Sequence, residues 1–399
     1  MTIKTIVLIP ILTGILLTPT ILYSQEINIG ILRDKNPQKF LIESPTGNYK
    51  LKSGKKTLLH LKKGRTAILN LTKGSINISN EKRDYGLHKQ VYLVSRKYKF
   101  NKAHDKDGSK KNAEFNVKLL DPKLNLRTYQ GNLKISADEK KVLLTNIVSM
   151  PDYLAGVVET ESGSKAEPEY YKNQVIISRT YAFKNLNNHR KEGFQLCDGV
   201  HCQAYKGKST GNENIQKAVS KTKDLVIANN ENKLVDAVFS ANCGGQTNNS
   251  EDVWTSNTSY LKSIEDIYCT DQPQAKWTKT ISFIDFKKFL KEKNISIPDT
   301  LSIDSFAFRQ PERTTLYNIA GQEIKLTVLR TGLALRSTFF DIEANGNELI
   351  FKGKGYGHGV GMCQEGAMNM ARKGFKYDEI IKYYYKDVKI ISLDKLQNE

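Results

Sequence analysis

The stretch YLAGVVETESGSKAEPEYYKNQVIISRTYAF, from Tyr153 to Phe183, places an acidic residue where the apolar face of a helix should continue. Leu154, Val157 and Val158 stand three and four positions apart, which predicts a short helix with one apolar face. The next turn of that face falls on Glu161. Either this assignment of the face is wrong, or Glu161 is a buried acid with a chemical task.

The same stretch predicts where the helices begin and end. Pro151 suits the first turn of the short helix, and Gly163 supplies a stop just beyond it. Glu159 points to another face of this helix and is expected to be solvated. The clearest helix of the chain follows over residues 168–188, where a proline opens the helix and apolar residues recur at helical spacing.

Outside these helices, the first part of the chain has the pattern of strands. Segments such as EINIGIL, TAILNLTKGSINIS and KQVYLVSRKYKF alternate apolar and polar residues between Gly, Asn and Lys turns. We therefore predict an α+β fold, with a β-rich amino-terminal region over residues 25–125 and a mixed domain with a few helices over residues 126–393.

Residues 1–24 have the layout of a secretory signal peptide. A lysine precedes an apolar run that prolines and a glycine interrupt, and small and polar residues end the run before Gln25. A permanent transmembrane helix is the alternative, and the short, interrupted run disfavours it. We expect the chain to be exported to the periplasm or cell envelope, and to be membrane-tethered where the signal stays uncut.

The composition indicates anionic partners. The net charge is +19 over 399 residues, which favours binding to nucleic acid, lipid headgroups or cell-wall polymers. After export, nucleic acid is not an expected partner. The Lys-rich stretch over residues 55–65 lacks stacking aromatic residues, and solvated lysines on exposed strands explain it equally well.

The cysteines suggest either a metal site or a local disulfide. Cys197, His201 and Cys202 lie together in CDGVHCQAY, and two thiolates with one imidazole suit zinc and leave one position for another ligand or water. A disulfide that closes a tight turn, or free thiols, are the alternatives. With five cysteines in all, at least one thiol stays unpaired unless a metal or another chain takes it.

Four motifs then carry a resemblance to a known family. The stretch from Tyr153 to Phe183, CDGVHCQAYKG, FSANCGGQTNNSEDVW with SYLKSI, and GKGYGHGVGMCQEGAMNMARKGFKYDEIIKYYY follow one another in this order. Together they resemble the stage II sporulation protein D family, which has a SpoIID/LytB domain, over residues 126–393. The resemblance implies helices around a glycan groove and a partner in peptidoglycan glycan strands. Some family members are similar to lytic transglycosylases that cleave peptide-stripped strands, and others are named as enhancers of amidases.

The resemblance implies that Glu161 is the catalytic acid and base. The family has a Glu three positions beyond a Val-Val pair, and GVVETE places Glu161 there, although Ser162 and Gly163 replace the usual Met and Pro. A single carboxyl can protonate the glycosidic oxygen and then take the proton of the C6 hydroxyl, which closes a 1,6-anhydro ring. Desolvation and the negative end of a helix both raise a carboxyl pKa toward the working pH.

The resemblance also implies residues that shape the groove. Arg179 is expected either to bind the sugar or to form an internal structural pair, and His358 either to donate to an acetamido group or to pack in a tight turn. The candidates for substrate binding are Gln174, Ser178, Arg179, Tyr181, His358 and Gln364.

For cofactors, the resemblance implies a structural zinc at Cys197, His201 and Cys202, because some family members look zinc-bearing. Cys243 and Cys269 are expected to form a disulfide or to remain free.

The sequence and the resemblance leave three candidate functions. The first is a lytic transglycosylase that uses Glu161. The second is a non-enzymatic module that activates an N-acetylmuramoyl-L-alanine amidase. The third, a zinc hydrolase, lacks an obvious general base.

Overall fold

Two sheets form the amino-terminal part of the molecule, and all their strand pairs are antiparallel except that of β1 with β13. Among the described residues, seven strands form one sheet in the order β13-β1-β12-β11-β8-β3-β4, and six form the other in the order β10-β9-β2-β5-β6-β7. The strands of the first sheet are β1 (Glu26–Ile31), β3 (Tyr49–Ser53), β4 (Lys56–Leu61), β8 (Gln90–Ser95), β11 (Asn132–Ala137), β12 (Val142–Ser149) and β13 (Leu196–Cys197). Those of the second are β2 (Lys39–Glu43), β5 (Thr66–Thr72), β6 (Ser75–Ser79), β7 (Asp84–His88), β9 (Glu114–Asp121) and β10 (Arg127–Gln130).

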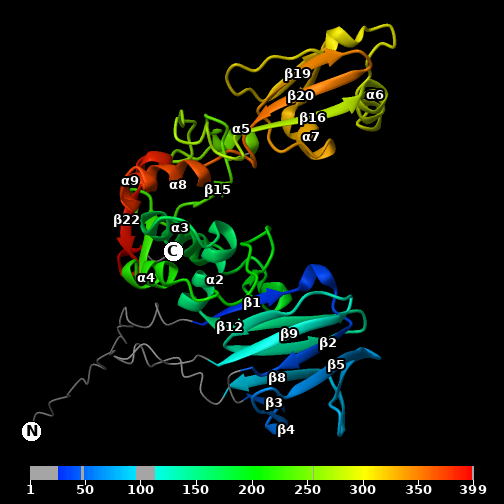
Figure 1. Ribbon diagram of the computed structural model, residues 1–399, viewed down its shortest axis with the longest axis vertical. Helices are drawn as coiled ribbons and strands as arrows, with labels where there is room; N and C mark the ends of the chain where they lie inside the picture. Colours follow the sequence, from blue (N-terminus) through cyan, green and yellow to red (C-terminus); the bar gives the residue numbers. More distant parts are fainter. Residues whose placement is uncertain (1–25, 46–48, 96–112, 255, 398–399) are drawn as a thin grey trace, which may run out of the picture.

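The computed structural model describes residues 26–45, 49–95, 113–254 and 256–397. In Figure 1 the sheets lie at the bottom, a group of helices in the middle and a smaller α/β part at the top. The predicted signal peptide over residues 1–24 lies outside the described residues. Within them, no helix combines the length and the apolar character that a membrane crossing requires.

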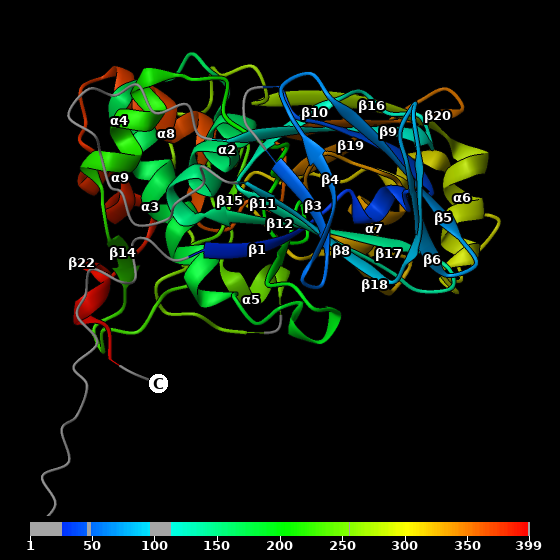
Figure 2. The same ribbon diagram turned by 90° about the horizontal axis from the view of Figure 1, so that it is seen from below.

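The two sheets pack through alternate side chains of their strands. Ala67 and Leu69 are buried on β5 and their neighbours are not, as expected for strands with one face in a core. Tyr49 of the first sheet meets Phe115 of the second edge-on at 5.9 Å. Figure 2 shows the strands of the two sheets from below, with the helical middle part to the left of them.

The sheets continue past the predicted boundary at residue 125. β9 pairs with β10, and β8 pairs with β11, so that strands before and after this position share both sheets. The change from strand to helix comes between Ser149 and Met150. The predicted division into residues 25–125 and 126–393 therefore does not coincide with a break in either sheet.

The middle part contains six helices among the described residues, and two of them are the helices that the sequence predicts, α2 (Met150–Ser162) and α3 (Pro168–Lys184). The others are α4 (Glu213–Lys221), α5 (Ser250–Val253), α8 (Gln364–Arg372) and α9 (Tyr377–Tyr384). The side chain of Ser149 accepts a hydrogen bond from the Asp152 N–H at 3.2 Å and caps α2. Gly163 ends this helix in the left-handed region at φ 67°. Short strand pairs join distant segments here: β14 (Leu225–Ala228) with β22 (Lys389–Ser392), and β15 (Phe239–Ser240) with β21 (Met362–Cys363).

The part at the top of Figure 1 has a hydrophobic core of its own. It contains β16 (Lys276–Ser282), α6 (Phe283–Glu292), β17 (Leu316–Ile319), β18 (Gln322–Lys325), α7 (Leu326–Gly332), β19 (Phe340–Asn345) and β20 (Glu348–Lys354). The three longer strands form a sheet in the order β16-β20-β19, and Phe286 of α6 packs on Phe351 of β20. The whole is an α+β fold with a β-rich amino-terminal region, which confirms the predicted fold class.

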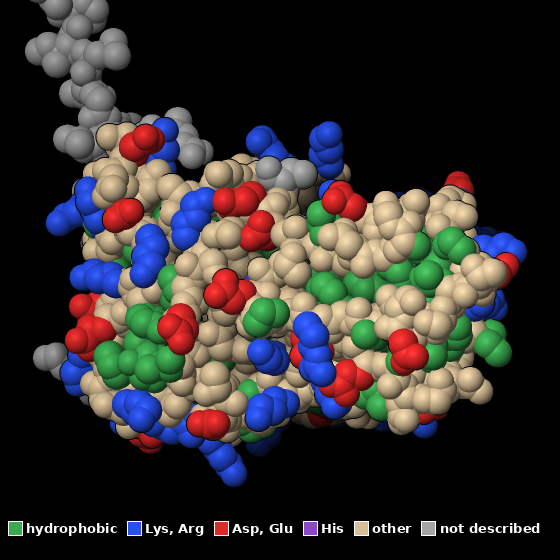
Figure 3. Space-filling view, turned by 90° about the horizontal axis from the view of Figure 1, so that it is seen from above, with side chains coloured by type: hydrophobic (Ala, Val, Ile, Leu, Met, Phe, Trp, Pro, Cys, Tyr) green, Lys and Arg blue, Asp and Glu red, His purple; other side chains and the backbone are tan. Residues whose placement is uncertain are grey.

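On the face that Figure 3 shows, the basic residues are spread among acidic ones. Figure 3 shows the top of the molecule, where Lys and Arg side chains stand among Asp and Glu side chains. Some lysines are paired locally, such as Lys262 with Glu251 at 2.6 Å. On this face the positive charge does not gather into one continuous basic patch.

Candidate functional site

Glu161 lies in the last turn of α2 and is half-buried, as its place on the apolar face predicts. Its Oε1 accepts a hydrogen bond from the Ala204 N–H at 3.0 Å. Burial raises the pKa of the Glu161 carboxyl, against the opposing effects of the Ala204 N–H and the charge of Lys206. Glu161 is therefore a carboxyl that holds its proton to higher pH than an ordinary glutamate.

The loop over residues 203–210 reaches Glu161 because α2 has a glycine opposite it. A Cβ on Gly156 would lie 2.2 Å from the carbonyl oxygen of Gly207 and 2.7 Å from the ring of Tyr205. No side chain larger than hydrogen fits there unless the loop moves. The glycine of the GVVETE motif thus lets the loop approach closely enough to place the Ala204 N–H on the acid.

Glu159 behaves differently although it is only two residues away. Burial alone would raise the pKa of its carboxyl, but hydrogen bonds from Ser209 and Thr210 lower it. The Thr210 N–H donates to Glu159 Oε2 at 2.7 Å, and the Thr210 hydroxyl donates to Oε1. The pKa shifts of the two acids at this helix end therefore run in opposite directions, and Glu161 is the one better suited to act as an acid.

Gln174 and Ser178 are fully buried inside α3, so neither side chain reaches the surface in this structure, and their part in substrate binding stays a prediction. The Tyr170 hydroxyl donates to Gln174 Oε1 at 3.2 Å, and Gln174 Nε2 donates to Ser178 Oγ at 3.4 Å. The charge of Glu161 acts on the Tyr170 hydroxyl, whose pKa burial raises. Gln174 and Ser178 thus hold the tyrosine that lies beside the acid rather than reaching the surface.

Gln364 is the first residue of α8, interacts with the Tyr170 side chain and is 8% exposed. Its Nε2 is buried and has no hydrogen-bond partner within the part of the chain that the structure describes. The structure brings this side chain together with Tyr170 next to Glu161, and its contact with substrate stays a prediction.

Arg179 takes the internal role of its two predicted alternatives. It is 1% exposed, and its Nη1 donates to the carbonyl oxygens of Thr222 at 2.7 Å and Leu225 at 2.9 Å. These bonds tie α3 to the end of α4 and the start of β14, so Arg179 does not bind sugar from this position.

Tyr181 is half-buried, and its hydroxyl donates to the carbonyl oxygen of His201 at 3.3 Å.

His358 belongs to a different part of the surface. Its ring lies 5.0 Å from that of Trp254, and its Nδ1 accepts from the Val360 N–H at 3.0 Å. Desolvation lowers the pKa of this imidazole to about 4, so the ring is neutral at pH 7. No contact of the described residues joins His358 to Glu161. The packed turn is the alternative that these contacts fit, and a direct role in substrate binding stays a prediction.

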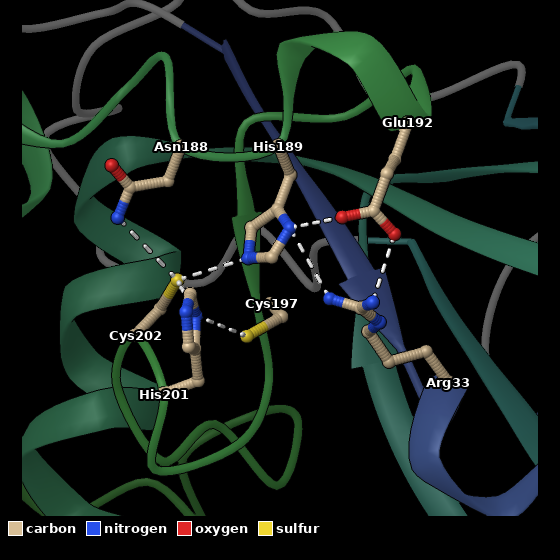
Figure 4. Close-up of polar contacts among 7 residues, drawn as sticks. All are labelled: Arg33, Asn188, His189, Glu192, Cys197, His201 and Cys202. Atoms are coloured by element: carbon tan, nitrogen blue, oxygen red, sulfur yellow. Dashed lines mark hydrogen bonds and ion pairs between the residues drawn. The ribbon is translucent and has the colours of Figure 1, made fainter.

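Cys197, His201 and Cys202 come together with a fourth residue, His189, which the sequence reasoning missed (Figure 4). The ligand atoms of all four lie within 4.8 Å of one another. Cys202 Sγ is 3.4 Å from His189 Nε2 and 3.5 Å from His201 Nδ1, and Cys197 Sγ is 3.8 Å from His201 Nδ1. Two thiols and two imidazoles at these distances can hold one metal ion in tetrahedral coordination.

His189 is also oriented for such a role. Its Nδ1 lies 2.5 Å from Glu192 Oε1, and Arg33 holds the same carboxylate at 2.8 Å (Figure 4). A carboxylate at one ring nitrogen fixes the tautomer and leaves the other nitrogen for a metal. The spacing His-x7-Cys-x3-His-Cys was the available sequence signal, but eight positions separate this histidine from the CDGVHC cluster.

One loop connects the cluster of His189, Cys197, His201 and Cys202 (the His189 cluster) to the N–H that contacts Glu161. Gln203 follows Cys202 directly; its Nε2 donates to the Ser178 carbonyl at 3.3 Å, and its Oε1 accepts from the Tyr153 hydroxyl at 3.1 Å. The next residue, Ala204, donates to Glu161. An ion at the cluster would therefore fix the segment that positions the N–H on the acid.

The expected disulfide between Cys243 and Cys269 is absent from the described residues. Their sulfur atoms lie 3.5 Å apart, and both are free thiols. Gly244, Gly245 and Gln246, which follow Cys243, line a cavity of about 560 Å³ on the side that faces β16 and β20.

Comparisons with known proteins match the same part of the chain. The family model for the stage II sporulation protein SpoIID matches residues 138–228, which include α2, α3 and the CDGVHC cluster. Stage II sporulation protein D of Bacillus amyloliquefaciens is 31% identical over 263 residues, 62% of this chain and 75% of that protein. Its counterpart in Bacillus subtilis strain 168 is 29% identical over 268 residues, 63% of this chain and 77% of that protein.

An amidase enhancer of Bacillus subtilis strain 168 is 27% identical over 362 residues, which span 70% of this chain and 50% of that protein. The family-model match covers the first two of the four sequence motifs, on α2, α3 and the loop that follows them. The chain therefore belongs to the stage II sporulation protein D family, with its SpoIID/LytB domain.

Proposed function

We propose that this chain is an exported peptidoglycan-remodelling enzyme, a lytic transglycosylase that cleaves glycan strands with Glu161 as its acid and base. The observation that carries the proposal is the half-buried Glu161 carboxyl with its raised pKa. The names of the sporulation and amidase-enhancer relatives support a role at the cell wall.

The chemistry needs a carboxyl that starts protonated and ends protonated. Glu161 gives its proton to the glycosidic oxygen as the bond to the anomeric carbon breaks, and the carboxylate then accepts the proton of the C6 hydroxyl. That oxygen closes on the anomeric carbon and leaves a 1,6-anhydro end, so no water is consumed. Among the described groups, only the Ala204 N–H and Lys206 offset the burial of Glu161, and no second carboxylate acts on it. Hydrolysis by paired carboxylates is therefore not supported.

The cluster of His189, Cys197, His201 and Cys202 supports a structural zinc. Two thiolates and two imidazoles complete a tetrahedral shell, which leaves no open position for a zinc-bound water. In the proposed enzyme these residues anchor the loop that carries Ala204, and the acid–base steps belong to Glu161 alone.

A Glu161→Gln variant tests the proposal. It keeps the size of the side chain and can still accept from Ala204, but it cannot exchange a proton. We expect cleavage of purified, peptide-free glycan strands, followed as 1,6-anhydro ends by mass spectrometry, to fall by roughly a hundredfold to ten-thousandfold. Strand binding should be retained.

Glu159→Gln is the matched control, since it removes a carboxylate two residues away that Thr210 holds. It should cleave nearly as well as the parent. If Glu161→Gln cleaves like the parent, Glu161 is not the acid and the transglycosylase is excluded.

The second candidate is a wall-binding activator of an N-acetylmuramoyl-L-alanine amidase, which the relation to an amidase enhancer favours. If the chain is such an activator, Glu161→Gln and Glu159→Gln should both raise amidase turnover on intact peptidoglycan as much as the parent does. Neither the parent nor the variants should then produce 1,6-anhydro ends.

A further inference from the structure

Four further ligand-type side chains meet in the interior, away from Glu161 and from the His189 cluster. Cys243, Asp266, Cys269 and Cys363 are each fully buried, and their ligand atoms all lie within 4.8 Å of one another. Cys243 Sγ is 3.5 Å from Cys269 Sγ and 3.2 Å from Asp266 Oδ2. They come from three segments that are far apart in the sequence: the loop after β15, the loop before β16, and β21.

Two of the three sulfur atoms of this group, those of Cys269 and Cys363, accept hydrogen bonds from backbone N–H groups. The Gly245 N–H donates to Cys269 Sγ at 3.2 Å, and Cys363 Sγ accepts from the N–H groups of Cys243 at 3.3 Å and Gly366 at 3.4 Å. A sulfur is a weak acceptor as a thiol and a much better one as a thiolate. The backbone around the group is therefore arranged for negatively charged sulfur.

The carboxylate is oriented in the same way. Asp266 Oδ2 accepts from the Tyr384 hydroxyl at 3.0 Å, and Oδ1 accepts from the Tyr268 N–H at 3.0 Å. Metal-ligating carboxylates are held by such outer hydrogen bonds. Arg313, which donates to the carbonyl of Cys243 at 2.5 Å, brings one positive charge beside three sulfurs and a carboxylate. If all four groups ligate as anions, the single charge of Arg313 does not balance them, and a divalent ion among them would supply the pairing that buried charges need.

We propose that Cys243, Asp266, Cys269 and Cys363 form a second metal site, which holds one zinc-type divalent ion in closed tetrahedral coordination. Thiolates about 2.3 Å from one tetrahedral ion lie roughly 3.8 Å apart, close to the separation of the Cys243 and Cys269 sulfurs. An iron–sulfur cluster would place its cysteines farther apart than this group allows. A disulfide between Cys243 and Cys269 would need a sulfur–sulfur distance of about 2.05 Å, and it would leave Cys363 and Asp266 buried without an ion.

The second site would join the rim of the cavity to α8. Gly244, Gly245, Glu265 and Thr270, which flank three of the ligands, line the cavity of about 560 Å³. Cys363 caps α8 by accepting from the Gly366 N–H, and Gln364 follows it directly. One ion would thus fix the cavity rim and the first turn of α8 together, and it does not depend on the reaction proposed for Glu161.

Metal analysis of the full chain, purified under reducing conditions without added metal or chelator, tests the second site. We expect roughly two metal equivalents per chain where the His189 cluster also binds, and one in each of Cys363→Ser and Asp266→Asn. The reciprocal control is the double variant Cys197→Ser, Cys202→Ser, which removes ligands of the other cluster only. It should keep one equivalent.

Cobalt substitution of that double variant separates the two sites. With Cys197 and Cys202 gone, thiolate-to-cobalt absorption must come from Cys243, Cys269 and Cys363, and we expect it to be strong. This readout needs no folding of the Cys363→Ser variant. A double variant that binds no metal and shows no such absorption, or a Cys243–Cys269 disulfide in the peptide map of the unreduced protein, would overturn the second site.

Discussion

The protonation of Glu161 depends on a balance between its burial at the end of α2 and two neighbours that favour the charged form. Burial raises the pKa, whereas the Ala204 N–H and the Lys206 ammonium lower it. The backbone N–H is fixed by the loop, but the lysine charge is a side-chain property that can be removed alone. The pH range of the proposed reaction is therefore adjustable through a residue that does not touch the reacting atoms.

Lys206→Met should shift the pH profile of glycan cleavage toward alkaline pH. The ammonium stabilises the Glu161 carboxylate, so its loss raises the pKa further and keeps the acid protonated at higher pH. The rate against pH for 1,6-anhydro product, measured for parent and variant, reports the shift of the basic limb. Lys165→Met, which removes another exposed lysine, should leave that limb in place; a shift of equal size in both variants would mean a general charge effect.

At the scale of elements, the approach of α2 to the loop over residues 203–210 determines the geometry of the site. The helix contributes the acid, the loop contributes the N–H donor, and Gly156 is the point where the two backbones meet. The same loop begins at the His189 cluster, so that one segment connects these candidate metal ligands to the N–H that contacts Glu161.

Gly156→Ala should destabilise the fold by about 1–3 kcal/mol, because the new Cβ overlaps the Gly207 carbonyl and the Tyr205 ring. The new Cβ should also displace the loop over residues 203–210, so the protein that does fold should cleave glycan strands more slowly than the parent. Thermal unfolding and product formation measure the two effects. The matched control is Gly199→Ala, where an added Cβ meets nothing within 4 Å. If the two variants have the same free energy of unfolding, the loop over residues 203–210 can move away from the new Cβ without destabilising the fold.

The sequence predicted the helices and the acid because those signals are local. The 3.6-residue period places Glu161 on the apolar face, and Pro151 and Gly163 mark the first turn and the end of α2. The ligand sets were harder to predict because they are not local. His189 joins a cluster that begins eight residues later, and Cys363 joins Cys243 through the pairing of β15 with β21. Motif similarity alone could not separate Arg179 inside the core from a residue on the surface.

At the scale of the whole molecule, the β-rich part and the helical part share one sheet. β13, which carries Cys197, pairs with β1, and β12 runs directly into α2. Asp198 strengthens this junction by accepting from the Leu32 N–H at 2.9 Å and from Arg127 at 3.1 Å. Figure 1 shows β1 and β12 on the side of the sheets that faces α2.

A shortened chain that begins at residue 126 should therefore fail to fold. It lacks β1 and β8, so β11, β12 and β13 lose neighbours and leave sheet edges and apolar side chains exposed. Circular dichroism, solubility and metal content of the shortened and full chains compare the two. A soluble, folded product that retains metal would instead establish residues 126–393 as an independent domain.

The exported form is expected to begin near Gln25, after removal of residues 1–24. Intact-mass measurement of protein recovered from the envelope of an expressing cell tests this, with a cytoplasmic sample of the uncut chain as the reference. A mass that retains the amino-terminal segment in the envelope fraction would indicate a membrane-tethered protein.

The pairing of β1 on both sides also dictates an order of assembly. The chain emerges from its amino end, so β1 comes first, but its register partners lie in β12 and β13, where Ile29 meets Asn146 and Leu196. Until β12 and β13 have been made, β1 has no strand to pair with, so this part of the sheet depends on pairing between residues far apart in the sequence. Cys197 arrives within the strand that completes this edge. An ion bound at Cys197 would therefore bind at a sheet edge that needs residues 196 and 197, and the strand made first would be among the last to gain all its partners.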